Sequence, residues 1–218
     1  MSLLLLACAA PVLEDGLVEL SAVEYRVDWR IEGVELHDQG FTLVTDSGWT
    51  VTVEEAWLVH NSVAMVPCSY GLAAGHALDE DPSTMTEAYI EDLSQPTEHT
   101  LASFSFDSEA YCEFFLLDAR HIGEGELTDL TLVVRGQAVR GRELRLLDLA
   151  SDASRGEIVA LDELDVYGEG DAARITVQRE LLTMFDGVDF SEGDELIAEA
   201  ILDRLFEDQV VSMELYSF

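Results

Sequence analysis

Residues 23–30 read VEYRVDWR, and this stretch decides the fold class. Apolar or aromatic residues occupy the odd positions and charged residues the even ones. A period of two is the pattern of a half-buried β-strand. Similar runs recur along the chain, and turn signals such as residues 38–40 and 46–48 separate them. Many short strands at this spacing predict a mainly β protein, an antiparallel β-sandwich.

The other expected strands cover most of the chain. They are residues 41–45, 49–53, 57–66, 101–106, 111–117, 130–139, 142–149, 174–180 and 210–216. The acidic segment Ser69–Thr100 interrupts them, and Thr84–Leu93 within it could supply a short helix. A second interruption carries apolar residues at helical spacing behind an N-cap signature, Ser191 with Asp194. It predicts a C-terminal amphipathic helix at about residues 192–207.

The N-terminal sequence Leu5-Leu6-Ala7-Cys8 resembles the lipobox of bacterial lipoprotein signal peptides, in which cleavage exposes a cysteine that becomes lipidated. The apolar stretch before it is short and no basic residue precedes it, unlike a complete secretory signal. Two interpretations stay open. Either a true start lies upstream and the signal is truncated, or the match arises by chance.

The lipoprotein interpretation divides the chain into three parts. Residues 1–7 are a truncated signal segment, residues 8–17 a lipidated tether, and residues 18–218 a single domain. No other stretch is long and apolar enough for a membrane helix, so the lipid on Cys8 would be the only membrane anchor. Ala9 after the cysteine favours the outer membrane by analogy with enteric sorting.

The charge of the chain is extreme. It has 45 acidic and 11 basic residues, a net charge of −34, and every basic residue is arginine. Phosphate backbones would be repelled, which excludes nucleic-acid binding. Adaptation of the surface to salt or to genome composition is one explanation of the acidity, and attraction of cations is the other. A hydrophobic content of 48% still supports a packed core.

The three cysteines fit an exported protein. With Cys8 assigned to the lipid, Cys68 and Cys112 remain as an even pair suited to a disulfide in an oxidising compartment. Two buried thiols, or two soft metal ligands, are the alternatives.

Signatures of catalysis are absent from the sequence. There is no Gly-x-Ser-x-Gly turn, no His-Glu-x-x-His helix and no glycine-rich phosphate loop. With 45 carboxylates, no acid–base pair can be selected from the sequence. The chain is therefore predicted not to be an enzyme.

Three histidines are candidate metal ligands: His60, His76 and His99. Imidazoles with nearby carboxylates suit copper or zinc. His60 shares its face of a predicted strand with Leu58, so a core histidine with satisfied hydrogen bonds is the alternative there. His76 and His99 lie in the segment between the two later cysteines, where they could also be ordinary loop residues.

A family resemblance is carried by FTLVTDSGW at residues 41–49, VTVEEA at 51–56 and FDGVDF at 185–190. These segments resemble acidic lipoproteins of myxobacteria and their relatives. That group looks distantly similar to the periplasmic copper-binding partner proteins of the methanobactin system. The likeness covers residues 18–217 in layout and implies a β-sandwich.

In the copper-binding family, histidines hold copper beside a tryptophan that a partner haem protein oxidises to kynurenine. The resemblance therefore implies Trp49 or Trp57 as the modified residue, although each could be a plain core aromatic. The chain departs from a compact copper site because it has no His-x-His or His-x-x-His pair. That departure puts copper binding in doubt.

The sequence thus predicts an exported, lipid-anchored protein of the cell envelope that binds a transition metal such as copper. The alternative is a structural or interaction lipoprotein without metal. The metal hypothesis requires two or more of the candidate histidines to lie together. An interaction protein should instead present an exposed apolar patch or an unpaired strand edge. An enzyme would need a deep pocket with convergent polar groups.

Overall fold

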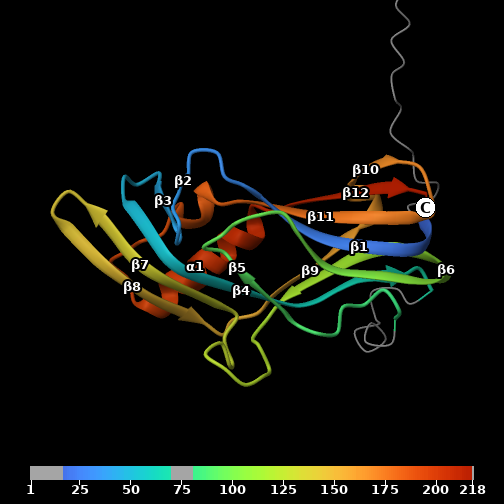
Figure 1. Cartoon of the computed structure of the whole chain (residues 1–218), viewed down its shortest axis with the longest axis horizontal. Coiled ribbons are helices and arrows are strands. Elements are labelled where there is room, and N and C mark those ends of the chain that lie inside the picture. The colour runs from blue at the N-terminus through green and yellow to red at the C-terminus, as the bar shows by residue number, and fades with distance from the viewer. Residues whose placement is uncertain (1–16, 70–80, 218) are drawn as a thin grey trace, which may run out of the picture.

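In the computed structural model, residues 17–69 and 81–217 are described, and they form a mixed β-sheet with one α-helix packed against it (Figure 1). The predicted fold class, mainly β with a C-terminal helix, is confirmed. The strands are β1 (Val18–Arg30), β2 (Glu35–Leu36), β3 (Phe41–Val44), β4 (Thr50–Pro67), β5 (Tyr89–Asp92), β6 (His99–Asp118), β7 (Leu132–Arg140), β8 (Glu143–Ser151), β9 (Arg155–Ala160), β10 (Asp165–Gly168), β11 (Ala172–Glu180) and β12 (Val210–Tyr216). The helix α1 is Asp194–Glu207, and short 3-10 turns occupy Leu161–Glu163 and Leu182–Phe185.

The sheet is mixed rather than wholly antiparallel. Most pairs are antiparallel as expected, but β1 pairs with β11, and β10 with β12, in parallel. Parallel neighbours need a long crossover connection. Most of the chain lies between β1 and β11, so this requirement is met.

Two long strands organise the sheet. β4 and β6 are each continuous, where the sequence predicted two shorter strands apiece. The first half of β4 pairs with β3 and β7, and its second half pairs with β6. The first half of β6 pairs with β1, and its second half with β4 and β9. Each long strand therefore contributes to two regions of the protein.

Those two regions have separate hydrophobic cores. One lies between β3, β4, β7, β8 and α1, and it buries Phe41, Leu149 and Ile201. The other lies between β1, β4, β6, β11 and β12, and it buries Tyr25, Phe114 and Met213. Figure 1 shows the β7–β8 hairpin and β10 at opposite ends of the molecule.

The helix begins as predicted but without the predicted cap. Its N-cap is Gly193, which has no side chain to cap the helix, and Ser191 bonds to Asp189 instead. Carboxylates of Asp194 and Glu195 in the first turn favour the helix through its dipole. Leu196 lies outside the buried face of the helix, since it is 56% exposed. The buried helix residues are Ile197, Ala198, Ile201, Leu202 and Leu205.

The expectation of a short helix at Thr84–Leu93 is wrong. Tyr89–Asp92 instead forms β5 along the edge of β4, and the Leu93 amide donates to the carbonyl of Ala56. An available strand edge offers hydrogen bonds to this segment, and tertiary pairing of that kind overrides weak local helix propensity.

The Cys68–Cys112 disulfide is present, with the two Cα atoms 5.0 Å apart. It links the end of β4 to the middle of β6 across 44 residues of sequence. By chain entropy, such a crosslink stabilises the folded state by about 4 kcal/mol as an upper estimate.

Cys8 lies outside the described residues, as does the truncated signal predicted around it. Among the helices of the described ranges, none has the length and apolar character to span a bilayer.

One outer sheet face carries no charged side chain over eight residues in cross-strand register. We call it the uncharged face. Leu146 and Leu144 are 72% and 62% exposed, and Val44 is 60% exposed. Two rows of neighbours make up the face, Val44–Thr50–Val139–Leu144 and Thr42–Thr52–Gln137–Leu146.

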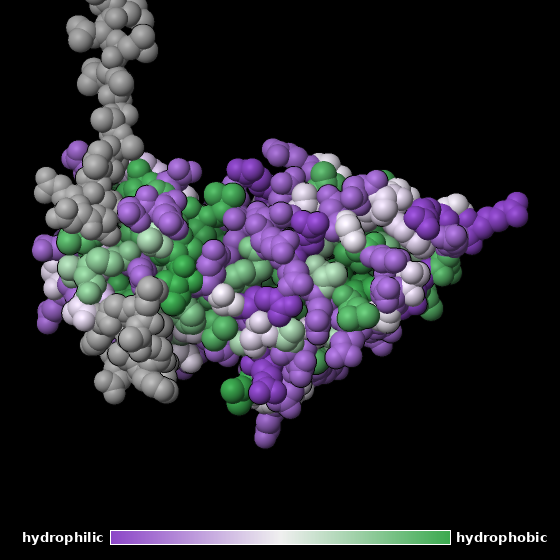
Figure 2. All heavy atoms as spheres, turned by 180° about the vertical axis from the view of Figure 1, so that it is seen from behind, coloured by the Kyte–Doolittle hydropathy of each residue, from purple (hydrophilic) through white to green (hydrophobic). Residues whose placement is uncertain are grey.

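Hydrophilic residues cover much of the side of the molecule seen in Figure 2, with apolar residues between them.

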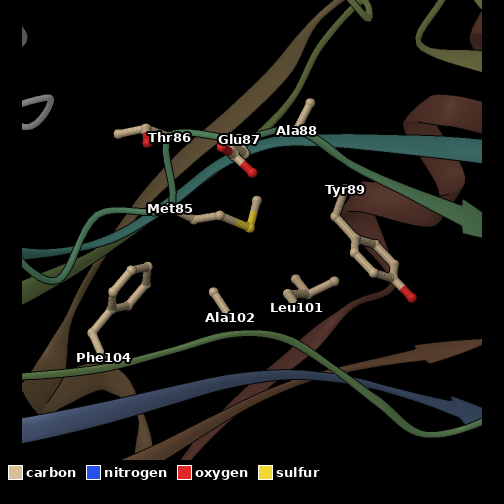
Figure 3. A pocket seen from close by; sticks show the side chains of 8 residues that line it. All are labelled: Met85, Thr86, Glu87, Ala88, Tyr89, Leu101, Ala102 and Phe104. Atoms are coloured by element: carbon tan, nitrogen blue, oxygen red, sulfur yellow. The ribbon is translucent and has the colours of Figure 1, made fainter.

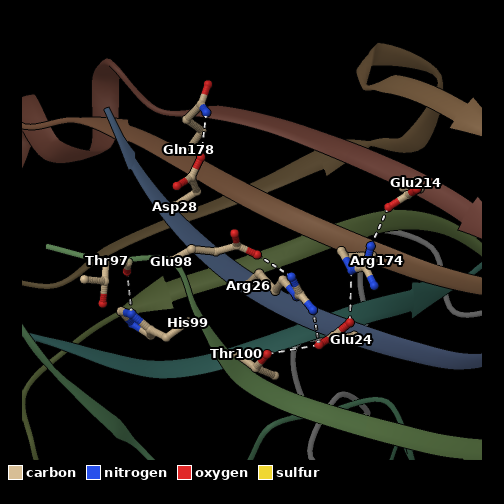
Figure 4. Close-up of polar contacts among 10 residues, drawn as sticks. All are labelled: Glu24, Arg26, Asp28, Thr97, Glu98, His99, Thr100, Arg174, Gln178 and Glu214. Carbon is tan, nitrogen blue, oxygen red and sulfur yellow. Dashed lines mark hydrogen bonds and ion pairs between the residues drawn. The ribbon is translucent and has the colours of Figure 1, made fainter. Parts of the chain in front are cut away.

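A different face, over β1, β6, β11 and β12, is tied together by ion pairs (Figure 4). Arg26 and Arg174 each approach Glu24 to 3.0 Å, and Thr100 donates to the same carboxylate. Arg174 also reaches Glu214 at 2.6 Å. Arg174 of β11 thus joins β1 and β12, and Arg26 of β1 also pairs with Glu98, just before β6.

Candidate functional site

A cluster of charged side chains lies buried where the two halves of the protein meet. Its members are His60 of β4, Glu91 of β5, Asp118 of β6 and Arg179 of β11, and we call it the buried charge network. None of the four is more than 1% exposed. Charged groups are almost never buried so completely unless they are paired.

His60 is the centre of the network. Its Nδ1 lies 2.8 Å from Oδ1 of Asp118, and its Nε2 lies 2.8 Å from Oε2 of Glu91. Both ring nitrogens therefore face carboxylate oxygens, which only accept hydrogen bonds when ionised. The ring satisfies both contacts only as an imidazolium that donates in two directions.

The two carboxylates are held from their far sides as well. Oδ2 of Asp118 accepts a hydrogen bond of 2.7 Å from Nη2 of Arg179. Oε1 of Glu91 accepts from the indole Nε1 of Trp29 at 2.5 Å. The Nε and Nη1 atoms of Arg179 are buried with no hydrogen-bond partner among the described residues. Asp118 is therefore the main compensation for burying Arg179.

The pKa shifts follow from this arrangement. Burial alone lowers the pKa of His60, but attraction and hydrogen bonding by Asp118 and Glu91 outweigh it and raise that pKa to about 9. Burial alone raises the pKa of Glu91 and Asp118, yet contacts with the two cations bring the pKa of each carboxyl below its usual value. With two cations and two carboxylates, the charges of the network cancel.

Two of the predicted metal ligands meet at one carboxylate. His99 Nε2 lies 3.3 Å from Oε1 of Glu91, the residue that also binds His60. The His99 ring is stacked on Tyr89, with ring centroids 5.2 Å apart. His76, the third predicted ligand, lies outside the described residues.

The predicted tryptophans lie elsewhere. Trp49 packs in the first core with its ring centroid 5.0 Å from that of Phe190. The guanidinium of Arg135 lies 5.9 Å from the ring centroid of Trp57. The tryptophan that contacts the network is Trp29, which the sequence had placed only on the inner face of its strand.

The described residues contain no group of three or more His, Cys, Asp and Glu side chains arranged to hold a metal ion. Within the network, His60 has both ring nitrogens committed to carboxylates. It therefore fits the alternative made from the sequence, a core histidine with satisfied hydrogen bonds. Metal ligation by His99 and His76 stays a prediction.

Sequence reasoning missed Glu91, Asp118 and Arg179, although the sequence carries a signal for the last two. Asp118 continues the inward positions of Phe114 and Leu116, and Arg179 continues those of Ile175 and Val177. A charged residue that replaces an apolar one in the inward register of a strand requires a buried partner. That rule, applied to each strand, selects these two residues together with His60.

Chemically, the network fixes structure. Each of its four charged members belongs to a different strand, so the contacts define how β4, β5, β6 and β11 approach one another. The side chains are enclosed and their polar atoms are mostly bonded to each other.

Comparison with known proteins identifies no relative of this chain. No family model, characterised protein or solved structure matches the chain. The likeness to acidic lipoproteins therefore stays a prediction, and function has to be argued from the residues themselves.

We predict that Asp118→Asn lowers the free energy of unfolding by about 3–5 kcal/mol, because it leaves His60 and Arg179 buried without their shared carboxylate. Urea denaturation followed by circular dichroism measures the change. The matched control is Asp148→Asn, which removes an exposed partner of Arg135 and should cost less than about 1 kcal/mol. Equal losses in the two variants would contradict a special role of the network.

A second prediction concerns pH. Since the folded pKa of His60 is about 9, above its unfolded value of about 6.5, the folded protein holds the proton more tightly. This stabilisation is complete below pH ~6.5 and is lost as pH rises through ~9, a change of about 3 kcal/mol. The lowered pKa values of Glu91 and Asp118 act oppositely, and their contribution is lost as the solution becomes strongly acidic.

Urea midpoints from pH 6 to pH 10 test this dependence, together with NMR titration of the His60 ring. The slope should shrink in Asp118→Asn, which lacks the main attraction on the imidazolium. A His60 ring that titrates near pH 6.5 would show the assignment to be wrong.

Proposed function

We propose that this protein is exported, is anchored in the cell envelope by a lipid on Cys8, and acts there as a non-catalytic interaction protein. The observation that carries the proposal is the Cys68–Cys112 disulfide. Disulfides form and persist in oxidising compartments and are rare in the cytosol. Pairing of these two cysteines leaves Cys8 as the third thiol of the chain, the one that the lipobox-like sequence assigns to the lipid.

Two surface features support an interaction role. The uncharged face exposes Leu144 and Leu146 in a chain whose net charge is −34. Exposed apolar patches of this kind are typical of interaction surfaces. In addition, the first half of β6 pairs with β1 on one side, and no described strand pairs with residues 99–109 on the other. An apolar patch and a strand edge without a partner among the described residues are the features expected of an interaction lipoprotein.

The lipid anchor predicts the fate of a Cys8→Ser variant. In cells of the source organism the variant should leave the membrane fraction, because no thiol remains for acylation. Mass spectrometry of the wild-type protein should find an acylated N-terminal peptide that starts at Cys8, with the outer membrane as the expected location.

The control is Cys112→Ser, which loses the disulfide and should remain attached to the membrane. Retention of Cys8→Ser in the membrane fraction would contradict the anchor, as would a wild-type N-terminus without lipid.

A second candidate function is copper binding. The observation that favours it is His99, whose ring is partly open to solvent and lies 3.3 Å from the Glu91 carboxylate. In this proposal His99 binds the metal together with His76, and any partner haem protein or modification of Trp49 or Trp57 depends on that site.

Titration of the full chain with Cu(I) against a competing chelator tests this candidate. A copper site predicts tight one-to-one binding that weakens at least about tenfold on His99→Ala or His76→Ala, with His37→Ala unchanged. Weak, multi-site and salt-sensitive binding would instead reflect only the attraction of cations to the acidic surface.

A further inference from the structure

We infer that a groove along the edge of β6 that no described strand pairs with binds an extended partner segment in which apolar and basic side chains alternate. This inference rests on the proposed interaction function and names its binding surface and the chemistry of its partner. The groove is formed by residues 82–89 on one side and residues 101–109 of β6 on the other. We call it the β6 groove.

The backbone of β6 forms the edge along which the groove runs. Between His99 and Glu109, one edge of the strand pairs with β1. The opposite edge has no partner strand among the described residues until Ala110, whose carbonyl accepts from the Cys68 amide, and Tyr111, where pairing with β4 begins. A free strand edge presents amide and carbonyl groups in the spacing that an added strand requires.

The surface beside that edge is hollowed along the strand. Two hollows follow one another along β6, the first with a volume of about 330 Å³ and the second shallower and wide open to solvent. Figure 3 shows the first hollow between Met85 and the β6 residues Leu101, Ala102 and Phe104. The second hollow is lined by Pro82, Ser105, Phe106, Asp107 and Glu109.

The walls of the first hollow are mainly apolar. Met85 belongs to the second hydrophobic core, and Leu101 and Phe104 pack against that core while remaining partly exposed. Burial of one partner side chain of the size of leucine on these residues would remove apolar surface from water on both sides. Alternate side chains of an extended segment point the same way, so every second residue of the partner would enter the groove.

The charge of the groove favours a basic partner. Glu87, Asp107 and Glu109 line the two hollows, and no arginine does. All 11 basic residues of the chain lie in the described ranges, and the ion pairs formed there leave these three carboxylates without an arginine partner. Basic side chains of a partner would therefore meet carboxylates that no internal cation neutralises. An acidic segment would be repelled by them and by the net charge of −34.

The test uses the full chain and a synthetic nine-residue peptide in which arginine alternates with leucine. Isothermal titration calorimetry should show one-to-one binding at moderate salt. Hydrogen exchange should show new protection of β6 amides between residues 99 and 109, as expected for an added strand. Absence of binding, or protection located elsewhere, would overturn the inference.

Two matched double variants separate the groove from general electrostatics. Glu87→Arg with Glu109→Arg reverses two carboxylates of the groove. Glu32→Arg with Glu54→Arg makes the same change in net charge at exposed sites that form no ion pair in the described structure. The groove variant should lower the affinity for the peptide at least about tenfold, and the control variant less than about threefold. Equal effects would mean that charge alone attracts the peptide and would overturn the inference.

Two further peptides test the apolar walls and the strand edge. Replacement of every leucine by glycine keeps the charge and should weaken binding at least about tenfold. N-methylation of alternate backbone amides should do the same, because it removes donors that an added strand needs. Unchanged binding of either peptide would contradict the proposed mode. These measurements do not involve the lipid, so their outcome is independent of the Cys8 experiment.

Discussion

Asp118 forms hydrogen-bonded ion pairs with both His60 and Arg179, and the centre of the fold depends on these two contacts. A carboxylate and two cations withdrawn from water are costly, and only mutual contact offsets that cost. The second carboxylate, Glu91, completes the balance of charge. Because the four residues come from four strands, a shift of one strand would leave a buried charge without its partner. The network therefore selects one arrangement of β4, β5, β6 and β11.

Much of the fold could be predicted from local patterns. Alternation in residues 23–30 and in similar runs predicts the strands, helical spacing predicts α1, and the cysteine count predicts the disulfide. The network could not be found in this way, because 58 residues of sequence separate His60 from Asp118 and 61 separate Asp118 from Arg179. Alternation shows that each points inward, but it does not show which strands are neighbours. The prediction of a helix at Thr84–Leu93 was wrong for a related reason. Part of that segment forms β5 because it pairs with the edge of β4, and local sequence does not show that this edge lies beside it.

The few arginines give the surface its character. Arg174 connects β11 to β1 and β12 on one face, and Arg135 forms the charged row Glu55–Arg135–Asp148 beside the uncharged face. Arg179 is buried and pairs with Asp118, so it neutralises no surface carboxylate. With so few cations available, their positions mark the places where the chain neutralises its own carboxylates. The β6 groove differs from these neutralised regions because it has carboxylates and no arginine. The uncharged face differs from them because it has no charged side chain.

The Cys68–Cys112 disulfide closes a loop of chain that contains the whole β6 groove. Both sides of the β6 groove, together with Glu91 and His99, belong to the stretch of chain between Cys68 and Cys112. A protease that cuts once within this stretch would leave two fragments still joined by the sulfur–sulfur bond. One fragment would carry the strands before the cut and the other those after it, and the protein would stay a single covalent molecule. This protection against a single cut lasts for as long as the surroundings keep the disulfide oxidised.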